Sequence, residues 1–366
     1  MKVIVTKQDL KDALARVMPA VAVKPQEPII SGIYFSAQEN QLEVRATNFQ
    51  QEIRVTIPAN VEVNGAVCVV GKYLVPIIAK LAGEIVTLTE ENKKLQIKSD
   101  AAQFELMTMD ADDFPREKPL DAEVSMRFQA IEFKESLKQV VFCASRDISR
   151  PIFMSVLIHQ KGAAAQFVAT NTHRVGRVKL NSFDEITGEK NLIVPVTACH
   201  ALINSLDNDS VITVSVGNNR ASFYFGNELL TTVLAEGTFP PVDKLFDLPK
   251  SITAEINIED FLAALDRVGV IARQTDYTQV TLEFTPDGLT LKANSMDIGS
   301  VVEHVDINLD GQSLVISFNI NYLWDTLRAL TTKTCRFAMN VRLEPVKING
   351  VGDDDAEYVI TPVRTQ

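Results

Sequence analysis

Hydrophobic and polar residues alternate along much of the chain, and three similar stretches share the same interruption of that alternation. The runs Leu42–Ala46, Ala165–Ala169 and Leu289–Ala293 alternate up to a final alanine, and a second strand-like run follows each polar break. Such a break between two runs of period two predicts a strand, a turn and a second strand. The alanines are spaced by 169 − 46 = 123 and 293 − 169 = 124 residues, so the 366-residue chain is predicted to be triplicated.

Two helices are predicted in every copy of this unit. The first begins at a polar capping position with an acidic residue three positions on, at Thr6 and Asp9, Gln129 and Glu132, and Asn257 and Asp260. Its apolar face recurs as Leu10, Ala13, Leu14 and Val17, as Phe133, Ser136, Leu137 and Val140, and as Phe261, Ala264, Leu265 and Val268. The second helix ends at Leu81, Leu206 and Leu330. Together with the alternating runs, this predicts an α+β fold with two helices and about eight antiparallel strands per unit.

Proline-bearing connectors separate the units. Phe114-Pro115 and Phe239-Pro240 are 239 − 114 = 125 residues apart, so they occupy the same phase of the repeat. Exposed connectors of this composition are typical of domain boundaries. The sequence therefore predicts three domains, at residues 1–121, 122–246 and 247–366.

Composition narrows the class of protein. Hydrophobic residues make up 46% of the chain and charged residues 23%, as in a soluble globular protein. The N-terminus lacks the apolar segment of a signal peptide, and the apolar stretch from Val67 to Leu81 is interrupted by Lys72 and Lys80. A cytoplasmic location is therefore expected. The net charge of −11 argues against open, diffuse binding of nucleic acid, although it does not describe a local surface.

Few residues or motifs of the sequence are candidates for catalysis or for metal binding. Asp110, Asp112 and Asp113 are better interpreted as a solvated linker than as a cation site, because no calcium-loop spacing follows them. The cysteines stand alone in apolar runs, which favours buried reduced thiols; they are Cys68, Cys143, Cys199 and Cys335. No phosphate-binding glycine loop or nucleophile motif is found. A hydrolase that uses His173 stays open as an alternative, but the absence of a catalytic pattern favours a non-enzymatic scaffold without a cofactor.

The chain resembles a known family in several stretches. These are the segment Ala169–Val175, the two Phe-Pro connectors and the ending Tyr358–Arg364. They are similar to the bacterial DNA polymerase III beta subunit, the replicative sliding clamp, and the resemblance covers the whole chain. It implies a non-catalytic, head-to-tail homodimer whose six domains close a ring around duplex DNA. Such a ring acts as a processivity factor that keeps the replicative polymerase on its template.

The resemblance also implies three sets of site residues. A surface for short peptide motifs of polymerases, the clamp loader and repair proteins would consist of Phe153, Thr170, His173, Arg174, Val175, Pro240, Leu245, Val359, Thr361, Pro362, Val363 and Arg364. There, Arg174 and Arg364 are expected to donate to carbonyl or carboxylate groups of the peptide. Sequence-independent contacts to double-stranded DNA would come from Lys24, Lys72, Arg146 and Arg150. The dimer interface would bring Phe104 and Leu106 against the helix that bears Val270 and Ile271.

Basic residues on the first helix of each unit are also expected to face the DNA, because they lie off the apolar face. They are Lys7, Lys11, Arg16, Lys134, Lys138 and Arg267. Two alternatives to a clamp remain at this point: a hydrolase built on α+β repeats, and a protein-interaction scaffold that does not bind DNA.

Overall fold

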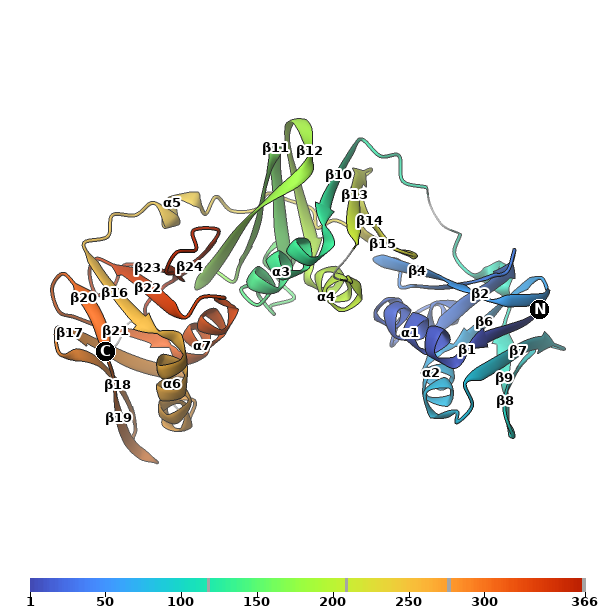
Figure 1. Cartoon of the computed structure of the whole chain (residues 1–366), viewed down its shortest axis with the longest axis horizontal. Coiled ribbons are helices and arrows are strands. Elements are labelled where there is room, and N and C mark those ends of the chain that lie inside the picture. The colour runs from blue at the N-terminus through green and yellow to red at the C-terminus, as the bar shows by residue number, and fades with distance from the viewer. Residues whose placement is uncertain (117–118, 208–209, 275–277, 364–366) are drawn as a thin grey trace. The chain divides into compact units, whose positions relative to one another are not determined.

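The computed structural model describes residues 1–116, 119–207, 210–274 and 278–363, whose helices and strands are labelled in Figure 1. The chain divides into two compact units. The first unit comprises Met1–Lys134, Ser182–Ile186 and Thr197–Leu234, and the second comprises Glu135–Asn181, Thr187–Val196 and Ala235–Gln366. Among the described helices, none has the length and apolar character needed to cross a membrane.

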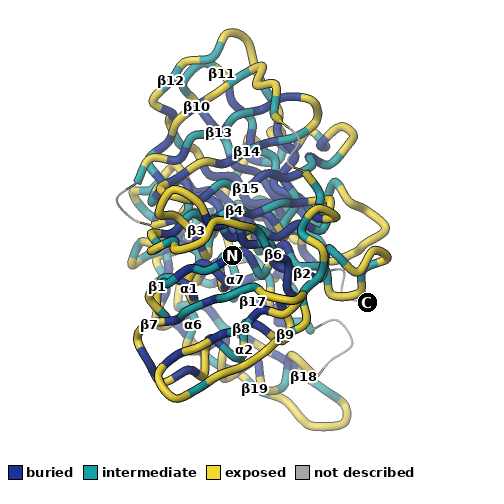
Figure 2. The backbone as a smooth tube through the Cα atoms, turned by 90° about the vertical axis from the view of Figure 1, so that its right-hand side faces the viewer, coloured by how far each residue is buried: buried dark blue, intermediate teal, exposed yellow. Residues whose placement is uncertain are grey.

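The first unit is built on one sheet of thirteen strands in the order β10-β13-β14-β15-β4-β3-β2-β6-β9-β8-β7-β1-β5. Figure 2 shows the run from β10 through β15 to β4 and β3, with buried and more exposed residues alternating along the strands. The strands are β1 (Lys2–Thr6), β2 (Gly32–Gln38), β3 (Gln41–Thr47), β4 (Gln51–Pro58), β5 (Asn60–Val63), β6 (Gly65–Val70), β7 (Ile85–Glu91), β8 (Lys94–Ser99), β9 (Ala102–Met109), β10 (Val124–Gln129), β13 (Val211–Gly217), β14 (Arg220–Phe225) and β15 (Glu228–Val233).

The helices of the first unit include α1 (Lys7–Val17), which begins where the capping pattern predicts. The others are α2 (Gly71–Lys80) and α4 (Val196–Ser205), while α3 (Ala130–Val141) passes from the first unit into the second. Thr6 caps α1 by accepting a hydrogen bond from the backbone N–H of Asp9 at 3.0 Å. The four residues of the predicted apolar face of α1 are buried, as are those of α3, so burial of this face fixes each helix on its sheet.

The second unit contains two sheets. One has seven strands in the order β11-β12-β24-β23-β22-β16-β20, and the other has four in the order β19-β18-β17-β21. The strands are β11 (Ser155–Thr170), β12 (Arg174–Pro195), β16 (Ile252–Asn257), β17 (Gln279–Thr285), β18 (Gly288–Ser295), β19 (Gly299–Val305), β20 (Ile307–Asp310), β21 (Leu314–Asn319), β22 (Thr334–Met339), β23 (Val346–Gly350) and β24 (Ala356–Ile360). The helices are the short α5 (Asp243–Phe246), α6 (Ile258–Ala272) and α7 (Ile320–Ala329). Asn257 caps α6, as predicted.

Two antiparallel strand pairs join successive repeats. In the pair that we call the first joint, β15 of the middle repeat lies beside β4 of the first, with Leu230 opposite Ile53. In the second joint, β24 of the last repeat lies beside β12 of the middle one, with Tyr358 opposite Gly176. These ladders draw the middle repeat partly into each compact unit, so the units divide the chain differently from the three predicted domains. The domain boundaries therefore remain a prediction.

The cysteine prediction is confirmed, since all four thiols are free and buried. Burial raises the pKa of each, for example that of Cys143 to about 12, which keeps the thiol protonated and unreactive at neutral pH. Among the described residues, no three His, Cys, Asp or Glu side chains are close enough together to hold a metal ion.

Candidate functional site

A tight turn between β11 and β12 organises the candidate site in the second unit. The hydroxyl of Thr170 donates to the carbonyl of Arg174 at 2.7 Å and accepts from the N–H of Thr172 at 3.1 Å. The side-chain oxygen of Asn171 accepts from the N–H groups of His173 and Arg174 at 3.0 and 2.9 Å. Thr172 adopts a positive φ of 74°. Side-chain hydrogen bonds thus satisfy the backbone of this turn and hold Thr170, His173 and Arg174 in place.

Arg174 is held in place by groups of the protein itself. Its guanidinium donates to Asp325 at 2.7 Å and to the backbone carbonyl of Phe142, and it lies 4.9 and 4.6 Å from the ring centroids of Phe142 and Tyr322. The residue is only 8% exposed. Two of its donors are thus engaged inside the protein, where they fix the turn against α7. The expectation that Arg174 binds the carbonyl or carboxylate groups of a peptide stays a prediction.

An apolar cluster lies beside this turn. Its buried members are Val168, Val175, Ile193, Phe239, Val242, Phe246 and Val359, and Ile152, Leu157, Ala235 and Leu245 pack partly buried against them. Val175, Val359 and Leu245 were predicted site residues. The other members were not predicted, and Phe239 was interpreted only as part of a linker. The spacing of Val242, Leu245 and Phe246 is the signal that could have revealed the short helix α5 and its apolar side.

The C-terminal segment reaches the same region. The N–H of Thr361 donates to the carbonyl of His173 at 2.9 Å, and the N–H of Val363 donates to the carbonyl of Ser317 at 2.8 Å. Thr361 is exposed, Pro362 is buried and Val363 is half-buried. Pro240, which follows Phe239 of the cluster, is half-buried as well. Arg364 lies outside the described residues.

A polar pocket of about 780 Å³ adjoins the turn on the side of α7. It brings predicted peptide residues together with predicted DNA residues, since both Phe153 and Arg146 line it. The complete lining consists of Phe142, Ala144, Ser145, Arg146, Asp147, Arg150, Phe153, Asn171, Thr172, His173, Arg174, Arg273, Asn321, Tyr322, Trp324 and Asp325. The two sets of residues in this unit therefore border one surface.

Several charged side chains of the polar pocket are paired locally. Hydrogen bonds from Ser149 hold the pKa of Asp147 below its usual range, so Asp147 is ionised beside Arg150 at 4.0 Å. Arg273 donates to Asn321 at 3.2 Å. The imidazole of His173 stacks on Tyr322, with ring centroids 6.4 Å apart. The pocket thus offers aromatic surfaces and charges of both signs.

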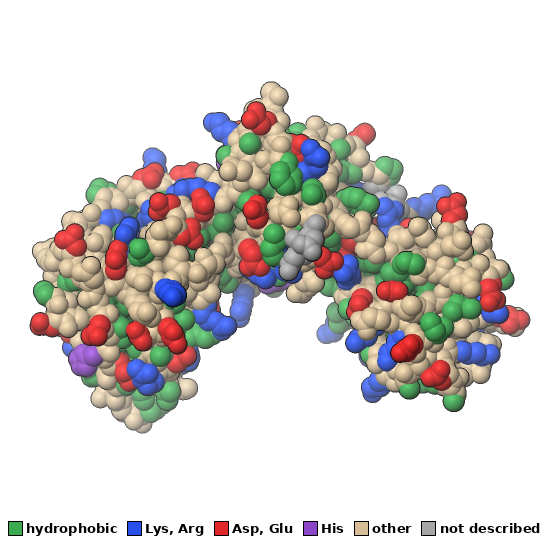
Figure 3. Space-filling view, in the orientation of Figure 1, with side chains coloured by type: hydrophobic (Ala, Val, Ile, Leu, Met, Phe, Trp, Pro, Cys, Tyr) green, Lys and Arg blue, Asp and Glu red, His purple; other side chains and the backbone are tan. Residues whose placement is uncertain are grey.

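The predicted DNA-binding residues of the first unit are exposed. Lys24 lies on the segment between α1 and β2, and Lys72 lies in the first turn of α2, 5.7 Å from the ring centroid of Tyr73. Arg146 and Arg150 of the second unit are exposed too. Figure 3 shows acidic and basic side chains interspersed on the visible face of each unit.

Most of the basic residues predicted on the first helices are engaged within the protein. Lys7 and Lys134 donate to backbone carbonyls, and Arg267 forms a two-point pair with Glu303 at 2.8 Å. Arg16 lies 3.5 Å from Glu228, and Lys138 lies 2.7 Å from Glu135. These helices therefore present less unneutralised positive charge than their sequence suggested.

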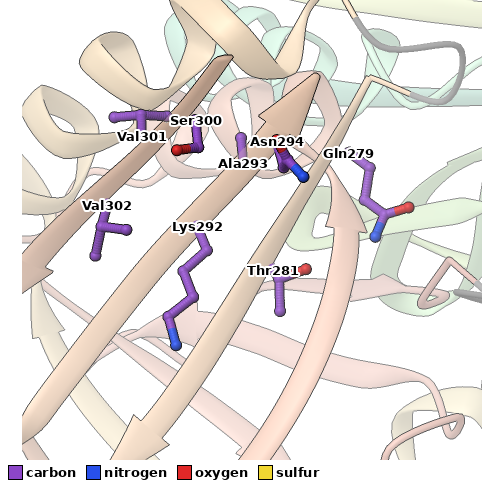
Figure 4. A pocket seen from close by; sticks show the side chains of 8 residues that line it. All are labelled: Gln279, Thr281, Lys292, Ala293, Asn294, Ser300, Val301 and Val302. Atoms are coloured by element: carbon purple, nitrogen blue, oxygen red, sulfur yellow. The ribbon is translucent and has the colours of Figure 1, made fainter. Parts of the chain in front are cut away.

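A second pocket, of about 450 Å³, lies on the four-stranded sheet (Figure 4). Figure 4 shows Lys292 of β18 between Thr281 of β17 and Val302 of β19. Lys292 pairs with Glu283 at 2.6 Å, and Thr281 shares a hydrogen bond with Ser317 at 2.9 Å. This polar sheet face borders β19, whose outer edge has no strand partner among the described residues.

The predicted interface residues are exposed or half-buried. In the first unit, Phe104 is 41% exposed and Leu106 is half-buried on β9. In the second unit, Val270 is 68% exposed on α6, next to the half-buried Ile271. Exposed apolar residues on edge strands and helices mark surfaces that favour association.

Comparison with known families accounts for the whole architecture. Residues 1–118 match the N-terminal domain of the DNA polymerase III beta subunit, residues 128–241 match its central domain and residues 246–364 match its C-terminal domain. The chain belongs to this family. The resemblance and the α+β clamp fold predicted from the sequence are thereby confirmed, and members of the family are the bacterial sliding clamps.

Individual relatives of the clamp family agree over the full length. The beta sliding clamps of Staphylococcus aureus and Staphylococcus epidermidis are each 29% identical, covering 97% of this chain and 96% of the relative. The DNA polymerase sliding clamp from Bacillus subtilis is 25% identical in sequence to this chain. Its crystal structure superposes over all of both chains with a TM-score of 0.94. A Pseudomonas aeruginosa sliding clamp solved with bound griselimycin shares the fold, with a TM-score of 0.95 over both full chains at 21% identity.

Proposed function

We propose that two copies of this chain join head to tail, in the cytoplasm, into a closed ring around duplex DNA that tethers a replicative polymerase to its template. The observation that supports ring closure is a strand pair between repeats that occurs twice among the described residues, although the repeat would allow it three times. β4 and β12 each have a partner from the next repeat, but within the described residues the equivalent strand β19 pairs only with β18. β9, the counterpart of β15 and β24, pairs with β8 and, at its end, with β6, so its outer edge at residues 102–107 is open among the described residues. A second copy supplies both missing partners.

The repeat also gives the register of this third joint. Leu230 lies opposite Phe223 in its own hairpin and opposite Ile53 across the first joint. Phe104 lies opposite Ile97 in the corresponding hairpin. On the other side, Ile53 lies opposite Ala46, and Val301 lies opposite Ala293, the equivalent alanine. Phe104 of one copy should therefore face Val301 of the other.

Disulfide trapping tests this register. In the proposed ladder Gln103 faces Val302, at a spacing that allows a disulfide, whereas Gln103 and Ser300 are diagonal neighbours about 7–8 Å apart. Oxidation of the double variant Gln103→Cys/Val302→Cys should give a covalent dimer on a denaturing gel. The matched variant Gln103→Cys/Ser300→Cys should not, and the natural cysteines do not interfere because they are buried. A dimer in solution that crosslinks only in the second variant would show the register to be wrong.

The side chains beside the third joint give an independent test. We propose that Phe104 and Leu106 pack against Val270 and Ile271 of the other copy. Aspartates at positions 270 and 271 would be buried without partners, at a cost of several kcal/mol. Val270→Asp/Ile271→Asp should therefore be a folded monomer by light scattering at low micromolar concentration. If this variant stays dimeric, these residues do not form the interface.

DNA contact is proposed to be weak, electrostatic and independent of sequence. A closed ring retains DNA topologically, so it needs few phosphate contacts, which agrees with a net charge of −11. Lys24, Lys72, Arg146 and Arg150 are exposed and can supply such contacts. Replacing Lys24, Arg146 and Arg150 by alanine should reduce retention on circular DNA and make it less dependent on salt, while stability changes little. Unaltered loading and salt dependence would remove these residues from the DNA surface.

Short peptide motifs of polymerases, the clamp loader and repair proteins are proposed to bind at the apolar cluster, with the polar pocket beside it. The support is the half-buried edge of the cluster, formed by Leu157 and Leu245, next to a turn that side-chain hydrogen bonds hold in place. A hydrolytic role is not supported, because Thr170 donates its hydroxyl proton to a backbone carbonyl and the ring of His173 stacks on Tyr322. We further propose that griselimycin, present in the Pseudomonas aeruginosa structure, binds the same surface here.

Truncation tests the location of the partner surface. Deleting residues 361–366 removes the hydrogen bonds from Thr361 to His173 and from Val363 to Ser317. The truncated chain should remain a dimer, because a chain end contributes little to a distant interface, but should lose affinity for griselimycin and for a labelled polymerase peptide. Full affinity in fluorescence anisotropy would place the partner surface elsewhere.

A further inference from the structure

The first joint carries the same backbone turn as the partner surface at the second joint. Thr47 donates to the carbonyl of Gln51 at 3.1 Å, and Asn48 accepts from the N–H groups of Gln50 and Gln51 at 3.1 and 2.9 Å. Phe49 has a φ of 68°, close to the 74° of Thr172 in the second joint. The two turns therefore share both hydrogen-bond pattern and backbone geometry, so their neighbouring side chains can be compared position by position.

We propose that the first joint is a sealed copy of the partner surface, closed by the side chain of Arg45. This inference rests on the proposed binding of partners at the second joint. Positions 45 and 52 of the first joint correspond to 45 + 123 = 168 and 52 + 123 = 175. At these two positions the second joint has Val168 and Val175, whereas the first has Arg45 and Glu52.

The residues around these positions correspond as well. Phe114 and Phe239 occupy the same place in the two Phe-Pro connectors. Across the strand ladder, Thr231 lies opposite Glu52, as Val359 lies opposite Val175. Three valines of the apolar cluster thus correspond to an arginine, a glutamate and a threonine at the equivalent backbone positions of the first joint.

Arg45 occupies the space as an internal ligand would. Its guanidinium donates to Glu52 at 2.8 and 3.2 Å and to the carbonyl of Pro115 at 3.3 Å. It also lies 5.6 Å from the ring centroids of both Tyr34 and Phe114. The side chains of Arg45 and Glu52 are only 11% and 14% exposed, so the pair is largely shielded from water.

An apolar ligand is excluded from the first joint for a physical reason. To enter, it would have to displace the guanidinium and break its shielded ion pair with Glu52, a cost that apolar contact does not offset. The pocket that remains at this joint has a volume of about 220 Å³ and is lined partly by Arg116 and Arg220, which do not favour an apolar side chain. Each chain therefore presents one apolar partner surface instead of two.

Calorimetric titration with griselimycin tests the proposal in both directions. The parent should bind one equivalent per chain. Arg45→Val/Glu52→Val, which restores the apolar residues of the second joint, should bind two. Val168→Arg/Val175→Glu, which installs the sealing pair in the second joint, should weaken binding at least on the order of 100-fold. The matched control Arg127→Val/Asp184→Val removes an exposed ion pair of the first unit and should still bind one equivalent.

The outcomes separate this inference from the function on which it rests. If the parent binds no griselimycin, the proposed partner surface fails. If the parent binds one equivalent and a folded Arg45→Val/Glu52→Val variant also binds one, the sealing role of Arg45 is wrong. Should that variant not fold by circular dichroism, the second joint decides alone: unchanged affinity of Val168→Arg/Val175→Glu, folded and dimeric, overturns the proposal.

Discussion

The two joints have the same kind of strand pairing but differ in the cations that surround a buried carboxylate. In the first joint the side chain of Glu228 is fully buried, and its nearest cation in the described structure, Arg16, is 3.5 Å away. In the second joint Glu357 is 2.6 Å from Arg177 and 2.5 Å from Lys347, with Lys179 at 3.7 Å. The backbone arrangement therefore does not decide whether a carboxylate is stabilised at a joint. The number and proximity of its cationic partners do.

The pKa values follow this difference. Burial raises the pKa of Glu228 to about 7, although hydrogen bonds from Ser205 and Arg16 oppose the change. Burial alone would also raise the pKa of Glu357, but hydrogen bonds from Lys347 and Arg177 outweigh it and hold that pKa below its usual range. The first joint thus bears an electrostatic cost at neutral pH, whereas the second gains from its ion pairs.

The largest expected effect is from Glu357→Gln. Removing the negative charge leaves Arg177 and Lys347 close together without their shared partner, so the second unit should lose about 2–3 kcal/mol at pH 7. The folded pKa of Glu357 lies below its unfolded value, so its contribution is present above the unfolded pKa and is lost as pH falls through the folded pKa. Trp324, the one tryptophan of the chain, lies in this unit, and its fluorescence during denaturation measures the loss. Equal stability of parent and variant at pH 7 would mean that the ion pairs contribute nothing.

Glu228→Gln should have the opposite sign and a smaller size. Because the folded pKa of about 7 lies above the unfolded one, the parent loses stability as pH rises from about 4.5 to 7 and then stays constant. The variant does not ionise, so it should be more stable by about 1–2 kcal/mol at pH 8 and nearly equal to the parent at pH 4. Guanidinium denaturation followed by circular dichroism at both pH values checks this. A destabilised variant at pH 8 would show that the charge of Glu228 is needed.

A smaller effect is expected at the turn of the partner surface. Asp325→Asn removes the charge that pairs with Arg174, but the guanidinium remains between Phe142 and Tyr322. The second unit should lose about 1 kcal/mol in denaturation followed by Trp324 fluorescence. Affinity for griselimycin should fall several-fold if Arg174 positions the turn. The first joint offers a control, because Gln51 occupies the position of Arg174 there and is held by a hydrogen bond to the carbonyl of Pro19 at 2.6 Å.

The sequence predicted the repeated framework well because that framework depends on local signals. The caps at Thr6 and Asn257 and the buried helix faces follow from residues a few positions apart. The turns after Ala46 and Ala169 were visible as polar breaks between alternating runs. Such features need no knowledge of which distant strands meet.

The character of each joint could not be predicted in the same way. Arg174 was expected to face a ligand, because the sequence does not show that Asp325, 151 residues away, lies at 2.7 Å. Similarly, Arg45 is an ordinary alternating residue of a strand until Phe114 and Glu52 are placed around it. Long-range strand pairing, and therefore the side chains that it brings together, decides whether a joint is apolar or sealed.

The smallest expected effect tests how Arg16 influences the pKa of Glu228 at the first joint. Asp207 is 75% exposed and lies 3.5 Å from Arg16, so it competes with Glu228 for that guanidinium, and its charge adds to the rise in the pKa of Glu228. Asp207→Asn should change stability at pH 7 by no more than about 0.5 kcal/mol, because exposed ion pairs contribute little. It should nevertheless shift the pH at which Glu228 titrates downward, because Arg16 is then shared with one carboxylate fewer. The carboxyl carbon resonance of Glu228, followed by NMR between pH 4 and 9, measures this shift in the folded protein. If the pKa of Glu228 is unchanged or higher in the variant, burial alone sets its titration. The difference in pKa between Glu228 and Glu357 would then not come from the number of nearby cations.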